Sequence, residues 1–319
     1  MNGELLAIQQ VGLRDLTIAM NGGHCLALVG SGPVSRDYGT WPSLLGTLHE
    51  RMGQGVLPFP LDPIPSDQLL KDWAERLATA DEAMFCRLMH ERFSRQESIP
   101  QVYNAILRAR FKAILTTNFD DQLITMANVC GLGRHFTPMA YPALKPELAG
   151  AIVHLHGRIL TPADVKDIVF TTSQFARAYL PTGMLRSMLT SIFFSYHLCF
   201  IGYSFSETEI QEISAAAKAH FQLHFRDPAA RRRVFALIKE TDWESVTSAD
   251  GTTYDVVSRM KAKFEAHGIT PIPYSLVNDQ YAGLRQLIEQ LPVQYPLSAP
   301  AQPAWLPSNE QHLGGPNHG

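Results

Sequence analysis

The stretch AILTTNFDD, residues 113–121, decides how the chain folds. A short apolar run ends abruptly in two threonines, an asparagine, a phenylalanine and two aspartates. An apolar run of this length, bounded by polar residues, is typical of a buried strand. In an open α/β sheet, ligands bind in the crevice outside the carboxyl ends of the strands. We therefore expect Asn118 and Asp120 to lie at the mouth of a binding site.

Two later stretches repeat this design, with helical patterns between them. HLHG at 154–157 and FIGYSFSE at 200–207 also place polar residues and glycine after an apolar run. The sequence predicts strands at residues 25–29, 113–116, 151–155, 168–170, 197–201, 234–238 and 269–274. Strands that alternate with helices form a mainly parallel sheet with helices on both faces. The predicted fold class is therefore α/β and Rossmann-like.

The domain organisation follows from the segments between these strands. We expect a single domain over residues 1–291, because no linker interrupts the alternating pattern. Several helical stretches predict a helical insertion at about 42–110, after the first strand. Residues 131–150 hold three prolines and predict a loop. Residues 292–319 are rich in Pro, Gly and Asn and predict a disordered tail.

Composition excludes several classes of protein. The 319 residues are 45% hydrophobic and 18% charged, as in a globular protein, and no apolar run is long enough to span a membrane. The net charge of -3 predicts no direct binding to nucleic acid or to an anionic membrane. The four cysteines form no CxxC pair, so we expect no metal site and free thiols in a reducing cytoplasm. We see no signal peptide at the amino terminus.

A glycine-containing turn follows the first predicted strand. Gly30 and Gly32 flank Ser31, and small residues at this point let backbone N–H groups approach a pyrophosphate. The third glycine of the dinucleotide fingerprint is absent, because Ser35 stands in its place. A tight turn at the end of the strand is the alternative interpretation of this pattern.

Four stretches in this order resemble a known family. VGSGPVS, LTTNFDD, HLHG and FIGYSFSETEI are similar to motifs of the sirtuin-like NAD-binding domains of bacterial anti-phage defence proteins, which are relatives of the protein deacylases. The resemblance covers roughly residues 25–290. It implies that NAD binds at the cofactor-binding residues Gly30, Ser31, Gly32, Thr117, Phe119, Gly202 and Ser204. It also implies that Asn118 holds the nicotinamide ribose and that His156 is a general base.

One departure from the family narrows the expected chemistry. Zinc-binding deacylases of this family carry two cysteine pairs between the His-Gly and Gly-x-Ser motifs. Here the interval 158–201 contains only Cys199. The missing zinc module favours cleavage of NAD by water over deacylation. An NAD-dependent deacylase or ADP-ribosyltransferase remains one alternative, and a non-catalytic NAD or ADP-ribose sensor is another.

The residue types also suit this chemistry. Cleavage of the ribose–nicotinamide bond develops positive charge on the sugar, which a carboxylate such as Asp120 stabilises. A neutral amide such as Asn118 positions a hydroxyl or water, and His156 accepts a proton near neutral pH. His154 alternates with His156 on the strand and is the candidate core histidine. The sequence does not separate the roles of Asp120 and Asp121.

The expected partners follow from the resemblance and from the toxicity of NAD cleavage. Unregulated hydrolysis of NAD harms the cell, so we expect control by self-assembly into a homo-oligomer or by a separately encoded partner. In related systems such partners include ATPases and Argonaute-like proteins. We also consider Glu240, just after the strand at 234–238, as an acceptor for the adenosine ribose.

Overall fold

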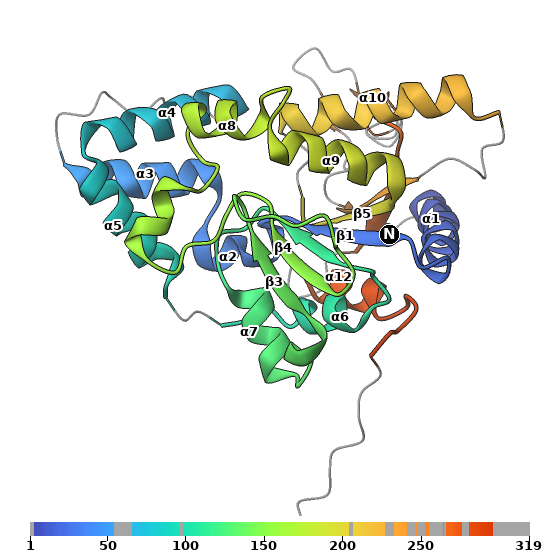
Figure 1. Ribbon diagram of the computed structural model, residues 1–319. Helices are drawn as coiled ribbons and strands as arrows, with labels where there is room; N and C mark the ends of the chain where they lie inside the picture. Colours follow the sequence, from blue (N-terminus) through green and yellow to red (C-terminus); the bar gives the residue numbers. More distant parts are fainter. Residues whose placement is uncertain are drawn as a thin grey trace, which may run out of the picture.

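Seven parallel strands form the central sheet, in the order β3-β4-β2-β1-β5-β6-β9 (Figure 1). The structure is a computed structural model that describes residues 3–53, 66–95, 98–203, 207–226, 233–240, 246–247, 253–254, 264, 266–275 and 281–295. The strands are β1 (Cys25–Val29), β2 (Ile114–Thr116), β3 (Thr137–Ala140), β4 (Ala151–His154), β5 (His197–Ile201), β6 (Val234–Lys239) and β9 (Ile269–Tyr274). A separate antiparallel pair joins β7 (Val246–Thr247) to β8 (Thr253–Tyr254).

The apolar strands explain why the sheet lies in the middle of the protein. Every residue of β1, β2 and β4 is buried, which requires cover on both faces of the sheet. Strand β1 pairs with β2 on one side and with β5 on the other, so the chain changes direction across the sheet at β1. A ligand crevice is expected outside the carboxyl ends of strands at such a switch point. The α/β, Rossmann-like fold predicted from the sequence is confirmed.

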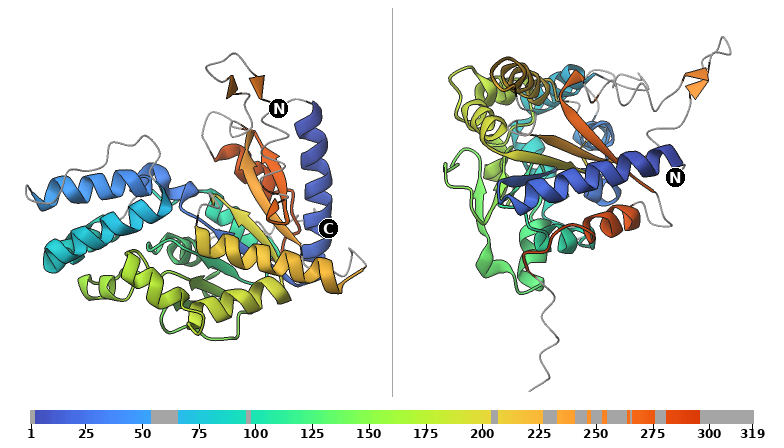
Figure 2. Two further views of the ribbon diagram at one scale, coloured as in Figure 1. Left: turned by 90° about the horizontal axis from the view of Figure 1, so that it is seen from above. Right: turned by 90° about the vertical axis from the view of Figure 1, so that its right-hand side faces the viewer.

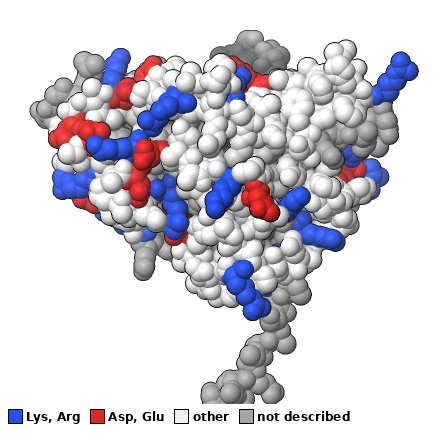
Figure 3. Space-filling model, viewed as in Figure 1, with Lys and Arg blue, Asp and Glu red and all other residues white. Residues whose placement is uncertain are grey.

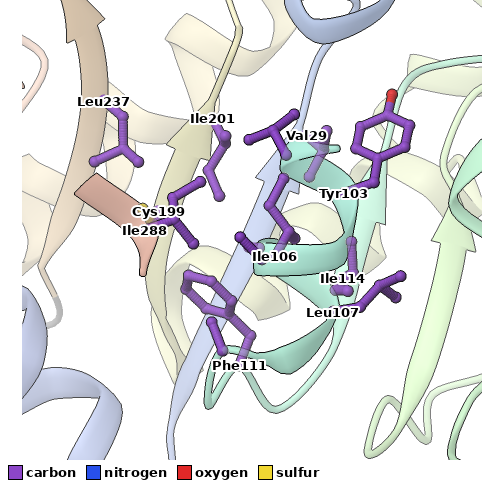
Figure 4. Close-up of a cluster of buried hydrophobic side chains, with 14 of the residues drawn as sticks. Val29, Tyr103, Ile106, Leu107, Phe111, Ile114, Cys199, Ile201, Leu237 and Ile288 are labelled. Carbon is purple, nitrogen blue, oxygen red and sulfur yellow. The ribbon is translucent and has the colours of Figure 1, made fainter. Parts of the chain in front are cut away.

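Helices cover both faces of this sheet. The helices are α1 (Gly3–Asn21), α2 (Ser35–Tyr38), α3 (Trp41–Met52), α4 (Asp67–Ala80), α5 (Glu82–Phe93), α6 (Val102–Arg108), α7 (Gln122–Val129), α8 (Thr172–Tyr179), α9 (Met184–Ser195), α10 (Thr208–His224) and α12 (Ala282–Ile288). Helices α9 and α10 lie on one face, and α6, α7 and α12 lie on the other (Figures 1 and 2). Figure 4 shows the second of these cores, where Tyr103, Ile106 and Leu107 of α6 approach Val29 and Ile114 of the sheet.

Helix α1 packs along the edge strand β9. A Cβ atom at Gly12 would lie 2.6 Å from the Ile272 side chain, so glycine allows the close approach. Helix α1 is 19 residues long. No helix within the described ranges is long and apolar enough to cross a membrane.

A helical module stands at the carboxyl ends of the strands. We define it as α3, α4 and α5 together with residues 159–170, because these segments share one hydrophobic core. Figure 2 shows α3 and α4 extending away from the sheet. The insertion predicted at about 42–110 is thus divided, since α6 packs against the sheet and not within the module. Charged side chains of both signs gather over the module in Figure 3. The module also carries the surface pairs Lys166–Glu82 and Arg51–Glu91.

Side chains cap the starts of α3 and α8. The Thr40 side chain accepts from the Ser43 N–H at the start of α3. Thr171 and Gln174 form a capping box at the start of α8.

Three local predictions are wrong. Residues 168–170 form no strand, because Ile168 and Phe170 turn into the core of the helical module. Residues 137–140, within the predicted loop, form β3, where Pro138 is tolerated because the strand lies at the edge of the sheet. Residues 292–295, expected in the tail, are held by backbone bonds such as Arg110 N–H to the Pro292 carbonyl at 2.7 Å. The rest of the tail lies outside the described residues.

Candidate active site

A pocket opens where β1, β2 and β4 end, beneath the helical module. It contains about 670 Å³ of space that no protein atom fills, part of it open to solvent. Its polar lining comes from the strand ends and includes Ser31, Thr117, Asn118, Asp120, His156 and Glu207. Its apolar lining includes Trp41, Leu44, Phe93, Phe119, Phe170 and Phe175. The sequence-predicted residues Ser31, Thr117, Asn118, Phe119, Asp120 and His156 therefore share one cavity.

Main-chain bonds at the end of β2 fix the position of Asn118. The Thr116 hydroxyl donates to the Val29 carbonyl at 2.9 Å and accepts from the Asn118 N–H at 3.1 Å. The Asn118 side-chain nitrogen donates to the Gly30 carbonyl and to the Tyr103 hydroxyl, each at 3.2 Å. Both N–H groups of the amide are thus engaged, and the amide oxygen is left to accept from a ligand.

His154 supports the same strand end from within the core. Its ring is completely buried, and its Nδ1 donates to the Asn118 carbonyl at 2.9 Å. Burial lowers the pKa of His154 to about 4, so the ring is neutral at physiological pH. The structure thus assigns His154 to the core, as its alternation with His156 allows.

His156 faces the pocket from the turn after β4. Gly157 forms this turn with a φ of 90°, a conformation that other residues rarely adopt. His156 Nε2 lies 2.8 Å from the Tyr179 hydroxyl, and the Phe175 ring packs edge-on at 5.3 Å. Burial, and then the charge of Lys71, lowers the pKa of His156 to about 3. The imidazole is therefore neutral at physiological pH, and burial makes it a weaker base than the solvent-exposed histidine on which the sequence expectation of proton transfer near neutral pH rested.

The two neighbouring aspartates have different positions. Asp120 is buried, lines the pocket and accepts from the Gln122 N–H at 3.0 Å. Asp121 is half-buried outside the pocket lining and pairs with Arg158 at 2.5 Å. The geometry therefore places Asp120, and not Asp121, in the lining of the pocket.

The glycine turns after β1 and β5 pack directly against each other. A Cβ at Gly30 would lie 2.6 Å from the Gly202 carbonyl, and a Cβ at Gly32 would lie 2.7 Å from it. The Gly30 N–H donates to the Ile201 carbonyl, and the Gly32 N–H donates to the Gly202 carbonyl. These two N–H groups therefore join the turns, and Ser31 is the residue of the glycine turn that lines the pocket.

Three other predicted cofactor contacts lie outside the pocket lining or outside the described residues. Gly202 contributes to the packing of the turns and does not line the pocket. Glu240 follows β6 and accepts from the Ser275 hydroxyl at 3.2 Å, also away from the pocket lining. Ser204 lies outside the described residues.

A group of charged residues behind His156 was missed by the sequence analysis. Glu207 lines the pocket, and its carboxylate lies 3.6 Å from His156 Nε2. Lys71 of α4 is 2% exposed and pairs with Asp67 at 2.7 Å and with Glu209 of α10 at 2.8 Å. Its ammonium also lies 3.9 Å from the centre of the Phe175 ring. The only sequence signal for this group is the run SETEI, which also suits the start of an ordinary helix.

The aromatic wall of the pocket was also unassigned. Trp41 packs against Phe170 at 5.5 Å and against Phe175 at 6.2 Å between ring centres. Phe119 contacts Phe93 and Phe170 edge-on. Because these rings come from the helical module, from α8 and from the turn after β2, only the folded arrangement brings them together.

Comparison with known protein families assigns the chain to one of them. The family model described as "SIR2-like domain" matches residues 112–272, just over half of the chain. The match includes Asn118, His156 and Gly202 but begins after the glycine turn at 30–32. No curated protein matches the chain. SIR2-like domains bind NAD and act as NAD-dependent enzymes. The chain belongs to the SIR2-like domain family.

Proposed function

We propose that the protein is an NAD hydrolase that cleaves NAD to nicotinamide and ADP-ribose in this pocket. The observation that carries the proposal is the placement of Asn118, Asp120 and a neutral His156 around one cavity at the switch point of the sheet. An amide acceptor, a carboxylate and a base are the groups that hydrolysis of a glycosidic C–N bond needs.

Each residue has a role that its surroundings support. The Asn118 amide oxygen accepts from a ribose hydroxyl or from the attacking water, because its N–H groups are already bonded. Asp120 stabilises positive charge that develops on the ribose. The neutral His156 takes the proton that water loses as its oxygen bonds to the ribose carbon. Nicotinamide leaves as a neutral molecule with the electrons of the broken C–N bond.

The positions of the cysteines support hydrolysis over zinc-dependent deacylation. Cys25 and Cys199 are buried in adjacent strands, and Cys86 is buried in the helical module. Cys130 lies at the end of α7. Burial raises the pKa of Cys25 and of Cys199, so both stay protonated. These thiols cannot together bind the zinc ion that supports the peptide cleft of a deacylase.

One assay tests the proposal against its alternatives. Purified protein is incubated with NAD, with and without an acetylated peptide, and the products are separated. We expect nicotinamide and ADP-ribose without peptide, and a loss of at least 1,000-fold in Asn118→Ala and His156→Ala. The matched control is Asn128→Ala, an exposed asparagine on α7. Acetyl-ADP-ribose formed only with peptide would show a deacylase, and binding of NAD without turnover would show a sensor.

We also propose that the activity serves defence against phage by depleting NAD. This role rests on the resemblance to sirtuin-like defence domains, and it requires control by a homo-oligomer or by a separate partner such as an ATPase or an Argonaute-like protein. Expression of the wild type in bacteria, with and without phage, should lower cellular NAD only in the triggered state. Asn118→Ala should leave the NAD level unchanged. An NAD level that never differs between the two proteins contradicts the defence role.

A further inference from the structure

Glu207 is placed as a second acid–base group of the pocket. It precedes α10, its side chain is 12% exposed, and its carboxylate oxygen lies 3.6 Å from His156 Nε2. Within the described part of the chain, Glu207 is the carboxylate that lies within 4 Å of the His156 ring nitrogens. The separation exceeds a hydrogen bond by about half an ångström, as is common for catalytic pairs without substrate.

The groups that face this carboxyl come from several elements. The Tyr203 hydroxyl, just after β5, lies against the Glu207 carboxyl. The Tyr179 hydroxyl of α8 contacts His156 Nε2, which is also the ring nitrogen nearest to Glu207. Asp67 and Lys71 approach from α4, and Glu209 follows on α10. The Lys71 ammonium is already shared by Asp67 and Glu209, so it does not neutralise Glu207 directly.

We propose that Glu207 and His156 work as an acid–base pair, in which Glu207 receives the proton that His156 takes from the attacking water. This inference rests on the proposed hydrolysis of NAD. The O–H bond of water breaks as its oxygen bonds to C1′ of the ribose, and the electrons of the C1′–N bond leave with nicotinamide. The proton passes through the imidazole to the Glu207 carboxylate and then to solvent.

The electrostatics of the pocket agree with this role. Burial raises the pKa of Glu207 to about 8, while the contact with Tyr203 lowers it in part. Between pH 5 and pH 7 the pair therefore holds one proton, which resides on the carboxyl next to a neutral imidazole. A cationic nicotinamide ring in the pocket favours the ionised carboxyl. Glu207 accepts the proton only in its ionised form, and the ionised fraction of the free protein grows as the pH rises toward 8.

Kinetics of Glu207→Gln give the first test. The amide keeps the size of the side chain but cannot accept the proton. We expect kcat to fall 10- to 100-fold with KM changed less than threefold. The rise of wild-type kcat/KM with pH, centred near pH 8, should disappear in the variant. Glu212→Gln, on the exposed side of α10, is the matched control and should behave as wild type.

Stability against pH gives a second test that does not use turnover. The folded-state pKa of Glu207 is raised above the unfolded value, so the native state binds the extra proton between about pH 4.5 and pH 8. This contribution to stability is lost as the pH rises through 8. The urea midpoint of Glu207→Gln, relative to wild type, should therefore increase from pH 5 to pH 8.5. Glu212→Gln should show a constant difference.

The outcomes separate this inference from the proposed function. If the wild type does not turn over NAD, the proposed function fails, whatever the stability data show. If the wild type is active and Glu207→Gln keeps at least half of its kcat with the same pH profile, only the acid–base pair is overturned. A pH-independent difference in urea midpoint also overturns it. Glu207→Asp, which retains a carboxyl, should recover part of the lost kcat and its pH dependence.

Discussion

The two walls of the pocket are built in different ways. The asparagine wall, defined as Asn118 and Asp120 with Thr116 supporting them from outside the lining, is fixed by bonds to the main chain at Val29, Gly30 and Gln122. The histidine wall, defined as His156 and Glu207 with Tyr179 supporting them from outside the lining, is fixed by side chains, and Lys71 joins α4 to α10 next to it. The first wall is thus part of the sheet, whereas the second depends on how the helical module docks.

The largest effect is expected where the module meets the histidine wall. Lys71→Met leaves Asp67 and Glu209 largely buried without their cation, since their side chains are only 13% and 21% exposed. We expect the free energy of unfolding to fall by about 3–5 kcal/mol in urea denaturation. Burial lowers the pKa of Lys71, but the two carboxylates outweigh it and hold the pKa above its usual value, so the ammonium is charged at neutral pH.

The matched control for this change is a surface pair on the same module. Arg51→Met removes the pair with Glu91, in which both side chains are well exposed. Such pairs contribute about 0–1 kcal/mol, so the control should lose little stability. Equal losses in the two variants would contradict the view that Lys71 holds the module against α10.

A smaller effect is expected in the turns beside the asparagine wall. Gly30→Ala places a Cβ 2.6 Å from the Gly202 carbonyl and 2.8 Å from the Tyr203 Cα, and both are backbone atoms that cannot move aside. We expect a loss of about 2 kcal/mol from overpacking, measured by thermal or urea unfolding. Gly46→Ala is the control, because its Cβ meets nothing within 4 Å on helix α3. It should gain up to about 1 kcal/mol.

These two walls also differ in what the sequence reveals. The strand ends at 113–121, 154–157 and 200–207 predicted the fold and the positions of Asn118, Asp120 and His156, because strand periodicity and polar termini are local signals. The glycines at 30 and 32 were predicted to let backbone N–H groups approach a pyrophosphate, and in the structure they allow close packing against the turn at Gly202. Local patterns therefore describe the asparagine wall well.

The histidine wall needed the tertiary structure. Lys71 and Glu209 are 138 residues apart, so nothing in the local sequence pairs them. Glu207 looks like the first turn of a helix until its burial beside His156 is known. The sequence also gives no indication that Tyr103 contacts Asn118, because an aromatic residue at helical spacing is usually part of a core. The strand wrongly predicted at 168–170 has the same origin, since its apolar residues serve the module and not the sheet.

A third prediction uses pH to compare the walls. The pKa of His154 is lowered to about 4 in the folded protein from about 6.5 when unfolded. The unfolded state therefore binds more protons between these values, and stability is lost as the pH falls below about 6.5. The loss of stability that His154 causes amounts to about 1 kcal/mol at pH 6. The pH dependence of stability that Glu207 causes has the opposite sign, because the pKa of Glu207 is raised to about 8.

The urea midpoint of a variant relative to wild type isolates the contribution of one titrating residue to this pH dependence. His154→Asn keeps a side-chain N–H near the Asn118 carbonyl but does not titrate. Its urea midpoint relative to wild type should rise as the pH is lowered from 7.5 to 5, whereas that of Glu207→Gln should fall over the same interval. Parallel pH dependences for both variants would show that the two walls do not titrate in opposite directions.

The smallest effect is expected from two tyrosine hydroxyls. Tyr103→Phe removes one of the two acceptors of the Asn118 amide nitrogen, so the amide can rotate and its oxygen is held less firmly toward the ligand. We expect kcat/KM for NAD to fall about fivefold, equivalent to about 1 kcal/mol. Tyr179→Phe removes the hydroxyl from His156 Nε2, but the Glu207 carboxylate remains near that nitrogen. We therefore expect kcat/KM to change less than twofold in Tyr179→Phe. A larger loss of kcat/KM in Tyr179→Phe than in Tyr103→Phe would show that the histidine wall depends more on its tyrosine hydroxyl than the asparagine wall does.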